Sequence, residues 1–295
     1  MQQIIGFEAI SQQLLQQFWQ EKLPHAIILA GNKGIGKATF ATQFAFSIDA
    51  ETKIITKQPN KTVITIDQIR EINDFLQKNS IAKQQKVLII DSICSLNKQA
   101  SNALLKPLEE PINNTFLILI AHQLNKVLPT ILSRCRLIKV PALNFDNFCQ
   151  VLLQNNQSSV FLPTELKFLS VLSGNSPAIA LQYGKNLLEF YQLWLESFTK
   201  NHFQTKLNKF IQQKDFDFII FEMVITHFLN SWLKFKMQSL GTYFFNEEQV
   251  FASLNLATSQ IIDLQEFINS RLIAIKTFHL DKKLAIINIF NKILQ

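Results

Sequence analysis

The eight residues 31–38, Gly-Asn-Lys-Gly-Ile-Gly-Lys-Ala, have the residue types and spacing of a loop that binds phosphate. They follow an apolar stretch and open a predicted helix, so Gly31, Gly34 and Gly36 would let backbone N–H groups point at an anion. Lys37 would then reach the β and γ phosphates of a nucleotide. The sequence therefore predicts a phosphate loop that ends at the start of a helix.

The loop lacks one group that holds the metal ion of a bound nucleotide. The residue after Lys37 is Ala38, whereas a Ser or Thr hydroxyl normally holds Mg²⁺ at this position. Thr39 lies one residue later, and one residue turns about 100° around a helix, so its hydroxyl points elsewhere. We expect the loop geometry to be kept, with weak or no nucleotide binding, a residual nucleotide or anion at most, and no metal ion.

A second segment puts a carboxylate where folds of this kind bind ligands. Residues 87–90 are wholly apolar, as in a strand covered on both faces, and Asp91 ends the run. Asp91 is therefore expected at the carboxyl edge of a sheet, where open α/β folds bind ligands. Asn97 is the predicted N-cap of the next helix. The apolar face of that helix carries Ala100, Ala103, Leu104 and Leu108.

Residues 86–140 as a whole closely resemble the AAA+ clamp-loader subunits of bacterial DNA polymerase III, and among these the delta prime type. Three motifs at the family's order and spacing carry the resemblance. They are Ser-Asn-Ala-Leu-Leu-Lys at 101–106, Leu-Glu-Glu-Pro at 108–111 and Leu-Pro-Thr-Ile-Leu-Ser-Arg-Cys at 128–135. The resemblance implies an α/β plus all-α protein with three domains. These are a RecA-like parallel-sheet domain at 1–142, a small helical lid at 143–184 and a helical collar that joins subunits at 185–295.

The resemblance also indicates which groups of an ATPase are missing. ATPases of this family have a Glu after the first acid, and here Ser92 follows Asp91. A serine cannot accept or orient the proton of the attacking water as a carboxylate does. The lid motif has an arginine that contacts the nucleotide, and here that position is about Ala178. His122 stands where ATPases sense the γ phosphate, but we favour a loop histidine without that role.

Arg134 is the strongest functional candidate. The resemblance implies that this arginine reaches across a subunit boundary to the ATP held by a neighbour, where it neutralises charge developing on the phosphates. The alternative is a surface arginine in a salt bridge, and the surrounding motifs favour the arginine finger. Cys135 is then expected to be a packed thiol, and Ser133 a hydrogen-bonding residue at a helix end.

The preferred function is a non-hydrolysing, delta prime-like stator of the clamp loader. The resemblance implies partners of the gamma/tau and delta types in a hetero-pentamer, with the sliding clamp and primed DNA contacted through the complex. One alternative is a catalytically active gamma/tau-type ATPase that tolerates Ala38. Another is a degenerate phosphate-loop protein in a different AAA+ assembly, such as a recombination or chaperone complex.

The remaining elements follow from the hydrophobic pattern. We expect a helix over residues 8–20, strands over 26–29, 63–66 and 116–121, and a polar link over 49–60. His25 is expected to be a packed, hydrogen-bonded residue beside the phosphate loop. From residue 185 onward the pattern is helical throughout, and residues 280–294 form a clear amphipathic helix.

Composition excludes several other classes of protein. The chain has 295 residues, 47% apolar and 17% charged, which fits a folded protein of two or three domains. A net charge of +7 permits contact with nucleic acid without requiring it. Cys94, Cys135 and Cys149 lack the spacing of a zinc site, so we expect no zinc. With no uninterrupted apolar run of roughly 18 residues and no signal peptide, we expect a cytoplasmic protein without membrane contact.

Overall fold

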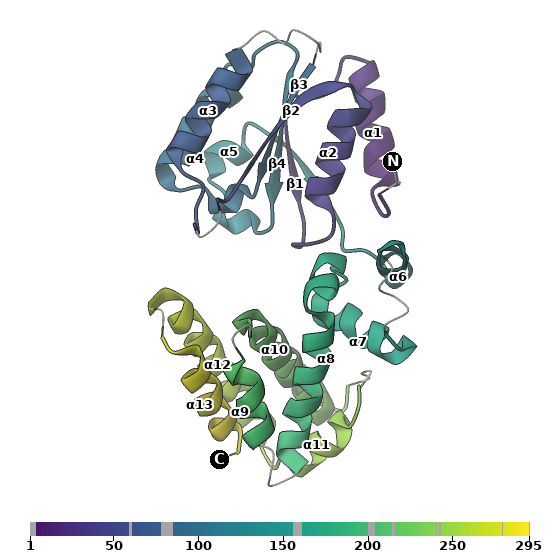
Figure 1. Ribbon diagram of the computed structural model, residues 1–295, viewed down its shortest axis with the longest axis vertical. Helices are drawn as coiled ribbons and strands as arrows, with labels where there is room; N and C mark the ends of the chain where they lie inside the picture. Colours follow the sequence, from purple (N-terminus) through teal and green to yellow (C-terminus); the bar gives the residue numbers. More distant parts are fainter. Residues whose placement is uncertain are drawn as a thin grey trace. The chain divides into compact units, whose positions relative to one another are not determined.

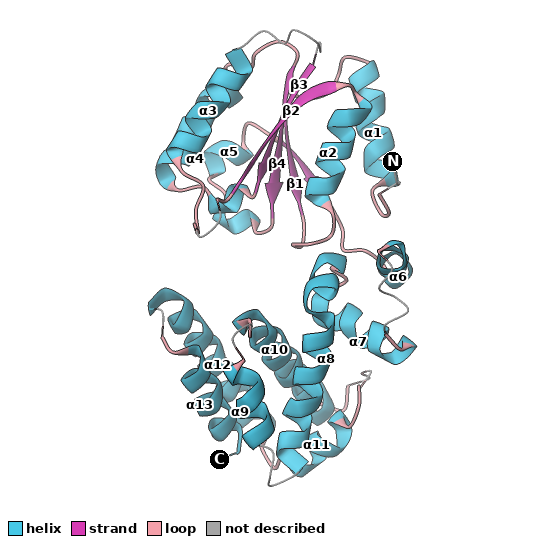
Figure 2. Cartoon of the chain, in the orientation of Figure 1, coloured by secondary structure: helices cyan, strands magenta, loops and turns pink. Residues whose placement is uncertain are grey.

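Two structural units make up the chain, which a computed structural model describes over residues 4–58, 61–77, 85–155, 161–199, 204–213, 216–239, 241, 243–278 and 280–294. The first unit comprises residues 1–155 and 174–178, and the second comprises residues 156–173 and 179–295. All the strands of the described chain belong to the first unit, whereas the second is helical (Figure 2).

The first unit is built on a five-stranded parallel sheet with strand order β2-β3-β4-β1-β5. The strands are β1 (Ala26–Ala30), β2 (Ala50–Thr56), β3 (Gln85–Asp91), β4 (Thr115–Ala121) and β5 (Arg136–Lys139). The central strands β1, β3 and β4 are almost wholly buried because helices cover both of their faces. The α/β fold predicted from the apolar runs is therefore confirmed.

Helices form a layer on each side of this sheet (Figure 1). The elements of the two layers are α1 (Glu8–Trp19), α2 (Lys37–Ser47), α3 (Ile66–Gln77), α4 (Lys98–Glu109) and α5 (Pro129–Leu132), with short 3₁₀ turns η1 (Ile93–Ser95) and η2 (Leu124–Lys126). Helices α1 and α2 pack on one face through a core that includes Leu14 and Phe40. Helices α3, α4 and α5 pack on the other face through a core that includes Ile72, Leu104 and Ile131.

The start of α4 is formed as the sequence predicts. The side-chain oxygen of Asn97 accepts a hydrogen bond from the Ala100 backbone N–H at 2.7 Å, which satisfies one of the free donors of the first turn. Ala100, Leu104 and Leu108 are buried against the sheet. The predicted cap and the predicted apolar face of this helix are therefore confirmed.

The second strand lies elsewhere than predicted. Residues 50–56, expected to be part of a polar link, form β2 at the edge of the sheet and pair with β3. Residues 63–66, expected to be a strand, contribute only an isolated bridge between Ile64 and Leu96, and α3 begins at Ile66. The prediction was wrong because an edge strand is partly solvated: only Ala50 and Ile55 of β2 are buried, and most of its other residues are polar.

His25 is hydrogen-bonded as predicted, but it does not lie beside the phosphate loop. Its Nε2 atom lies 3.1 Å from the backbone oxygen of Leu108, at the end of α4. His25 precedes β1, and the phosphate loop follows β1. The two are therefore at opposite edges of the sheet, separated by the length of a strand.

Helix α6 (Phe145–Gln154) closes the first run of residues in the first unit. The helices that follow are α7 (Pro163–Ser173), α8 (Pro177–Thr199), α9 (Gln204–Gln212), α10 (Phe218–Lys236), α11 (Glu247–Ser253), α12 (Thr258–Phe278) and α13 (Lys282–Leu294). The predicted helical character of this half of the chain is confirmed. The expected boundary between residues 184 and 185 falls inside α8, and the three-domain division stays a prediction.

The second unit has an aromatic core that contains one carboxylate. Trp194, Phe221, Phe228 and Trp232 are among its fully buried side chains. Glu247, at the start of α11, is 0% exposed. Its Oε1 atom accepts a short hydrogen bond from the Tyr191 hydroxyl and lies 2.8 Å from His227 Nε2, while its Oε2 atom accepts from the Phe244 N–H at 2.9 Å. Burial, together with the charge and hydrogen bond of Glu247, raises the pKa of Tyr191 well above its usual value.

Helix α10 is the one helix of the described chain whose length and composition alone would allow it to cross a membrane. Half of its most apolar window is buried inside the structure. It contributes Val224, Phe228 and Trp232 to the core of the second unit. Core helices of globular proteins commonly have this composition, so the length and apolarity of α10 are weak evidence for a membrane span.

Candidate functional site

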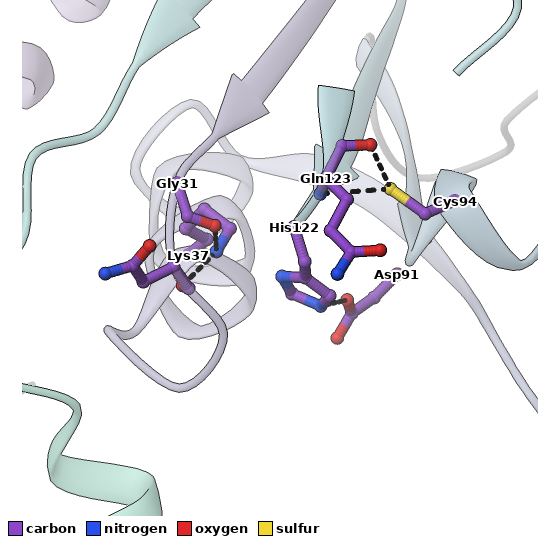
Figure 3. A network of polar contacts seen from close by, with 7 residues as sticks. Gly31, Lys37, Asp91, Cys94, His122 and Gln123 are labelled. Atoms are coloured by element: carbon purple, nitrogen blue, oxygen red, sulfur yellow. Dashed lines mark hydrogen bonds and ion pairs between the residues drawn. The ribbon is translucent and has the colours of Figure 1, made fainter. Parts of the chain in front are cut away.

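Three strand ends bring the predicted site residues together at the carboxyl edge of the sheet. Strand β1 ends at Ala30 and leads into the loop at Gly31, β3 ends at Asp91, and β4 ends just before His122. Strand β4 lies between β1 and β3, so these ends are neighbours. Figure 3 shows Lys37, His122 and Asp91 at this edge.

Two glycines of the predicted phosphate loop have left-handed backbone angles. Gly34 and Gly36 have φ angles of +83° and +100°, which residues with a side chain rarely adopt. A Cβ atom at Gly34 would come within 2.2 Å of the Ser176 hydroxyl oxygen, so this position excludes any larger residue. Gly36 is the N-cap of α2, and the loop therefore leads directly into a helix N-terminus.

Lys37 is turned back onto its own loop. Its side chain is buried, with only 3% of the residue exposed, and its ammonium donates to the backbone oxygens of Gly31 at 2.7 Å and Asn32 at 2.5 Å (Figure 3). Burial lowers the pKa of Lys37 from 10.5 to about 8, and the nearby Asp91 carboxylate and Cys94 thiol act in the opposite direction. Two of the three donors of the Lys37 ammonium are thus engaged by the loop itself.

The lowered pKa of Lys37 predicts a pH dependence of stability. Between about pH 8 and 10.5 the unfolded chain holds a proton on Lys37 that the folded chain has lost, so the free energy of unfolding rises with pH. We expect a gain of about 1 to 2 kcal/mol between pH 7 and 9.5, relative to a Lys37→Met variant. Urea unfolding of both proteins across this range measures it. Parallel pH profiles for the two proteins would contradict the prediction.

Asp91 is paired with a histidine. Its Oδ1 atom lies 3.6 Å from Nε2 of His122 (Figure 3). The Nδ1 atom of the same ring is buried and has no hydrogen-bond partner among the residues that the structure describes. His122 therefore lies next to the Asp91 carboxylate, and the expectation that it does not sense the γ phosphate stays a prediction.

The positions at which the resemblance implies the hydroxyl and the carboxylate of a metal-nucleotide site lie in the first unit. Ala38 offers only a methyl group, Thr39 is exposed on the next position of α2, and Ser92 is buried with 6% of its surface exposed. Within the described parts of the chain, no three His, Cys, Asp or Glu side chains are grouped so that they could hold a metal ion. The expected absence of zinc and of a bound metal stays a prediction.

The start of α8 touches the phosphate loop within the first unit. The Ala178 backbone N–H donates to the Gly34 oxygen at 3.2 Å. The methyl group of Ala178 would lie 3.1 Å from a Cβ atom at Gly34. The position at which the resemblance implies an arginine is therefore beside the phosphate loop, but it carries no charge.

Sequence reasoning missed the role of Cys94 in this site. Its Sγ atom lies 3.1 Å from the backbone oxygen and 3.4 Å from the backbone nitrogen of Gln123, and so joins η1 to the segment after β4 (Figure 3). Neither residue belongs to a motif with recognisable spacing. No signal in the sequence could have identified this contact.

Arg134 lies at the opposite edge of the sheet from the phosphate loop. Arg136, two residues later, pairs with Ile27 near the start of β1, whereas the phosphate loop begins at Gly31, after β1 ends. A strand rises about 3.3 Å per residue, so the five residues of β1 separate the two edges by about 13–17 Å. Arg134 is therefore out of reach of a nucleotide held by its own phosphate loop.

Arg134 is exposed and held by three contacts. Its side chain is 36% exposed, and its Nη2 atom lies 2.8 Å from Oε1 of Glu109. Its Nη1 atom donates to the Thr130 backbone oxygen at 2.9 Å and to the Ser133 hydroxyl at 3.3 Å. The Ser133 hydroxyl in turn bonds the Thr130 oxygen at 3.1 Å, as expected for a residue at a helix end. Burial raises the pKa of the neighbouring Cys135 thiol to about 11, in agreement with a packed thiol.

Comparison with known proteins finds subunits of DNA polymerase III among the similar proteins. A family profile described as "DNA polymerase III, delta subunit" matches residues 49–144. DNA polymerase III subunit gamma of Buchnera aphidicola (Schizaphis graminum) is 30% identical over 63% of this chain and 56% of that protein. Subunit delta' of Pseudomonas aeruginosa is 30% identical over 38% of this chain and 41% of that protein. The chain thus matches about half of the length of these curated relatives.

A solved structure agrees with the fold over nearly the whole chain. It is a DNA polymerase III gamma subunit-related protein from Thermotoga maritima, with 19% identity, a TM-score of 0.51 and 98% of each chain covered. At this level of identity the likeness supports the fold alone. The relatives include both gamma and delta' subunits at similar identity, so the comparisons leave the choice between the two types open.

Proposed function

We propose that this chain, which belongs to the DNA polymerase III clamp-loader family of AAA+ proteins, is a delta prime-type subunit that supplies Arg134 to the ATP site of a neighbouring subunit. In this role it hydrolyses no ATP itself and acts as a stator. It helps to load the sliding clamp onto primed DNA during replication, in a cytoplasmic complex with gamma/tau-type and delta-type subunits.

The position of Arg134 carries this proposal. Its guanidinium is exposed, and it lies across the sheet from the chain's own phosphate loop. A guanidinium at such a site can act only on a ligand that another molecule brings to it. In phosphoryl transfer, an arginine supplied in this way neutralises the charge that develops on the phosphates.

The composition of the phosphate loop site supports the absence of hydrolysis. Three positions that would hold Mg²⁺, orient water or contact phosphate carry Ala38, Ser92 and Ala178. None of these side chains can supply the missing carboxylate or positive charge. Lys37, which remains, donates to Gly31 and Asn32.

The second candidate is an active ATPase of the gamma/tau type. The glycine conformations of the phosphate loop favour it, as does the 34% identity over 154 residues to DNA polymerase III subunit tau of Bacillus subtilis. Phosphate release by the purified chain, with Mg²⁺ and ATP, distinguishes the two. If the chain is a stator, we expect no ATP hydrolysis by the isolated chain. We expect a complex of the chain with its cognate gamma/tau-type and delta-type subunits to hydrolyse ATP. Turnover by the isolated chain would overturn the proposal.

Restoring the hydroxyl that binds Mg²⁺ is expected to leave the isolated chain inactive. Ala38→Thr supplies one metal ligand, but Ser92 still provides no carboxylate to orient the attacking water. We expect phosphate release at the background rate of the unaltered chain. A rate well above that background would show that the missing hydroxyl alone prevents hydrolysis.

A further inference from the structure

The residue that contacts the Arg134 guanidinium from a different element is Glu109, the last residue of α4. The two residues are far apart in the sequence, and their side chains meet at 2.8 Å because α4 and α5 pack against each other. Thr130 and Ser133, by contrast, are local neighbours that any arginine at this position could contact. Glu109 is therefore the one contact among these three that depends on the tertiary fold.

Both ends of this pair are fixed to the core of the first unit. Leu108, next to Glu109, is 2% exposed, and its backbone oxygen lies 3.1 Å from His25 Nε2. Ile131, in the short helix before Arg134, is 1% exposed. The backbone on each side of the ion pair is thus anchored, so the ion pair joins two fixed points of the first unit.

The contacts of Arg134 leave part of the guanidinium free for an anion. A guanidinium has five N–H donors, and two of these on a planar edge can bind two phosphate oxygens. The two Nη1 donors are directed at Thr130 and Ser133, and one Nη2 donor is directed at Glu109. One Nη2 donor and the Nε donor have no such contact within the described part of the chain and remain for a phosphate group.

The pair contributes little to folding stability. The side chains of Arg134 and Glu109 are 36% and 49% exposed, and exposed ion pairs of this kind are worth about 0–1 kcal/mol. An unrestrained arginine, however, samples many rotamers, and a catalytic group that is misplaced by a small distance loses much of its effect. The contact with Glu109 would therefore affect the orientation of the Arg134 guanidinium more than the stability of the fold.

We infer that Glu109 is a positioning residue, which holds the Arg134 guanidinium toward the phosphates of ATP bound to the neighbouring subunit. This inference rests on the proposed function of Arg134 as an arginine finger. Glu109 itself touches no nucleotide and acts only through Arg134. Its loss should therefore change the rate of hydrolysis and leave the affinity for ATP unchanged.

The test uses the reconstituted complex in which the neighbouring subunit is the only one able to hydrolyse ATP. We expect Glu109→Ala to lower kcat about tenfold, with KM unchanged. Glu109→Gln keeps an oxygen that accepts from Nη2, and we expect its kcat to stay within about threefold of the unaltered complex. Glu110→Ala removes the same charge from the adjacent, exposed residue and should have no effect. Size-exclusion chromatography verifies assembly of each complex.

Arg134→Ala in the same assay distinguishes a failure of the positioning role of Glu109 from a failure of the proposed function of Arg134. If Arg134→Ala slows ATP hydrolysis but the Glu109→Ala complex has a kcat at or above the normal value, the positioning role alone is overturned. A changed KM at normal kcat in Glu109→Ala would overturn it as well. A normal rate in Arg134→Ala would instead contradict the proposed function.

Discussion

Replacing Arg134 by alanine is expected to slow ATP hydrolysis about a thousandfold at the neighbouring site that this arginine serves, without dissociating the complex. The guanidinium is exposed at the sheet edge opposite the phosphate loop, so its removal leaves the chain's own fold intact. It forms only solvated contacts, and exposed ion pairs contribute about 0–1 kcal/mol to folding. Single-turnover hydrolysis in a complex with one active neighbour measures the effect.

A matched control is available two residues away. Arg136→Ala removes the same charge at the start of β5, where the Arg136 guanidinium donates to Gln17 Oε1 at 3.1 Å. If the loss of activity came from the change in net charge alone, complexes with either Arg134→Ala or Arg136→Ala would hydrolyse ATP slowly. We expect the Arg136→Ala complex to hydrolyse ATP at the normal rate. An unchanged rate in Arg134→Ala would remove the finger assignment.

Replacing Glu247 by alanine is expected to lower the free energy of unfolding by about 3–5 kcal/mol, because it breaks a buried, hydrogen-bonded cluster around the carboxyl group. The carboxylate is 0% exposed and pairs with Tyr191, His227 and the Phe244 N–H. Without it, three polar groups in an apolar core lose their partner, and a cavity is left. Urea unfolding followed by circular dichroism measures the change.

The adjacent residue serves as the control for this stability prediction. Glu248 has the same side chain on the same helix, but it is exposed. Glu248→Ala should change the free energy of unfolding by no more than about 0.5 kcal/mol. Equal effects of the two substitutions would contradict the structural role of Glu247.

The elements that the sequence predicted well are those whose signal is local. The wholly apolar run before Asp91 requires a strand covered on both faces, and the Asn97 side chain caps α4 over three residues. Gly34 and Gly36, in the loop after β1, have left-handed backbone angles that suit glycine. In each case neighbouring residues contain all the information that the structure uses.

The elements that were predicted wrongly depend on a partner elsewhere in the chain. Strand β2 has more polar than apolar residues because it lies at the edge of the sheet, and its own sequence does not reveal which strand it will join. His25 was expected near the phosphate loop because the two are close in sequence. The length of β1 separates them in space.

The sequence by itself predicted the α/β fold, which is confirmed, and it placed three glycines and Lys37 in one loop with Ala38 after them, and Ser92 after Asp91. The tertiary structure decided where Lys37 directs its ammonium and which partner holds Arg134. These contacts join residues from separate elements or depend on how a loop closes. The amino-acid sequence specifies which side chains are available, whereas tertiary packing specifies which of them come into contact.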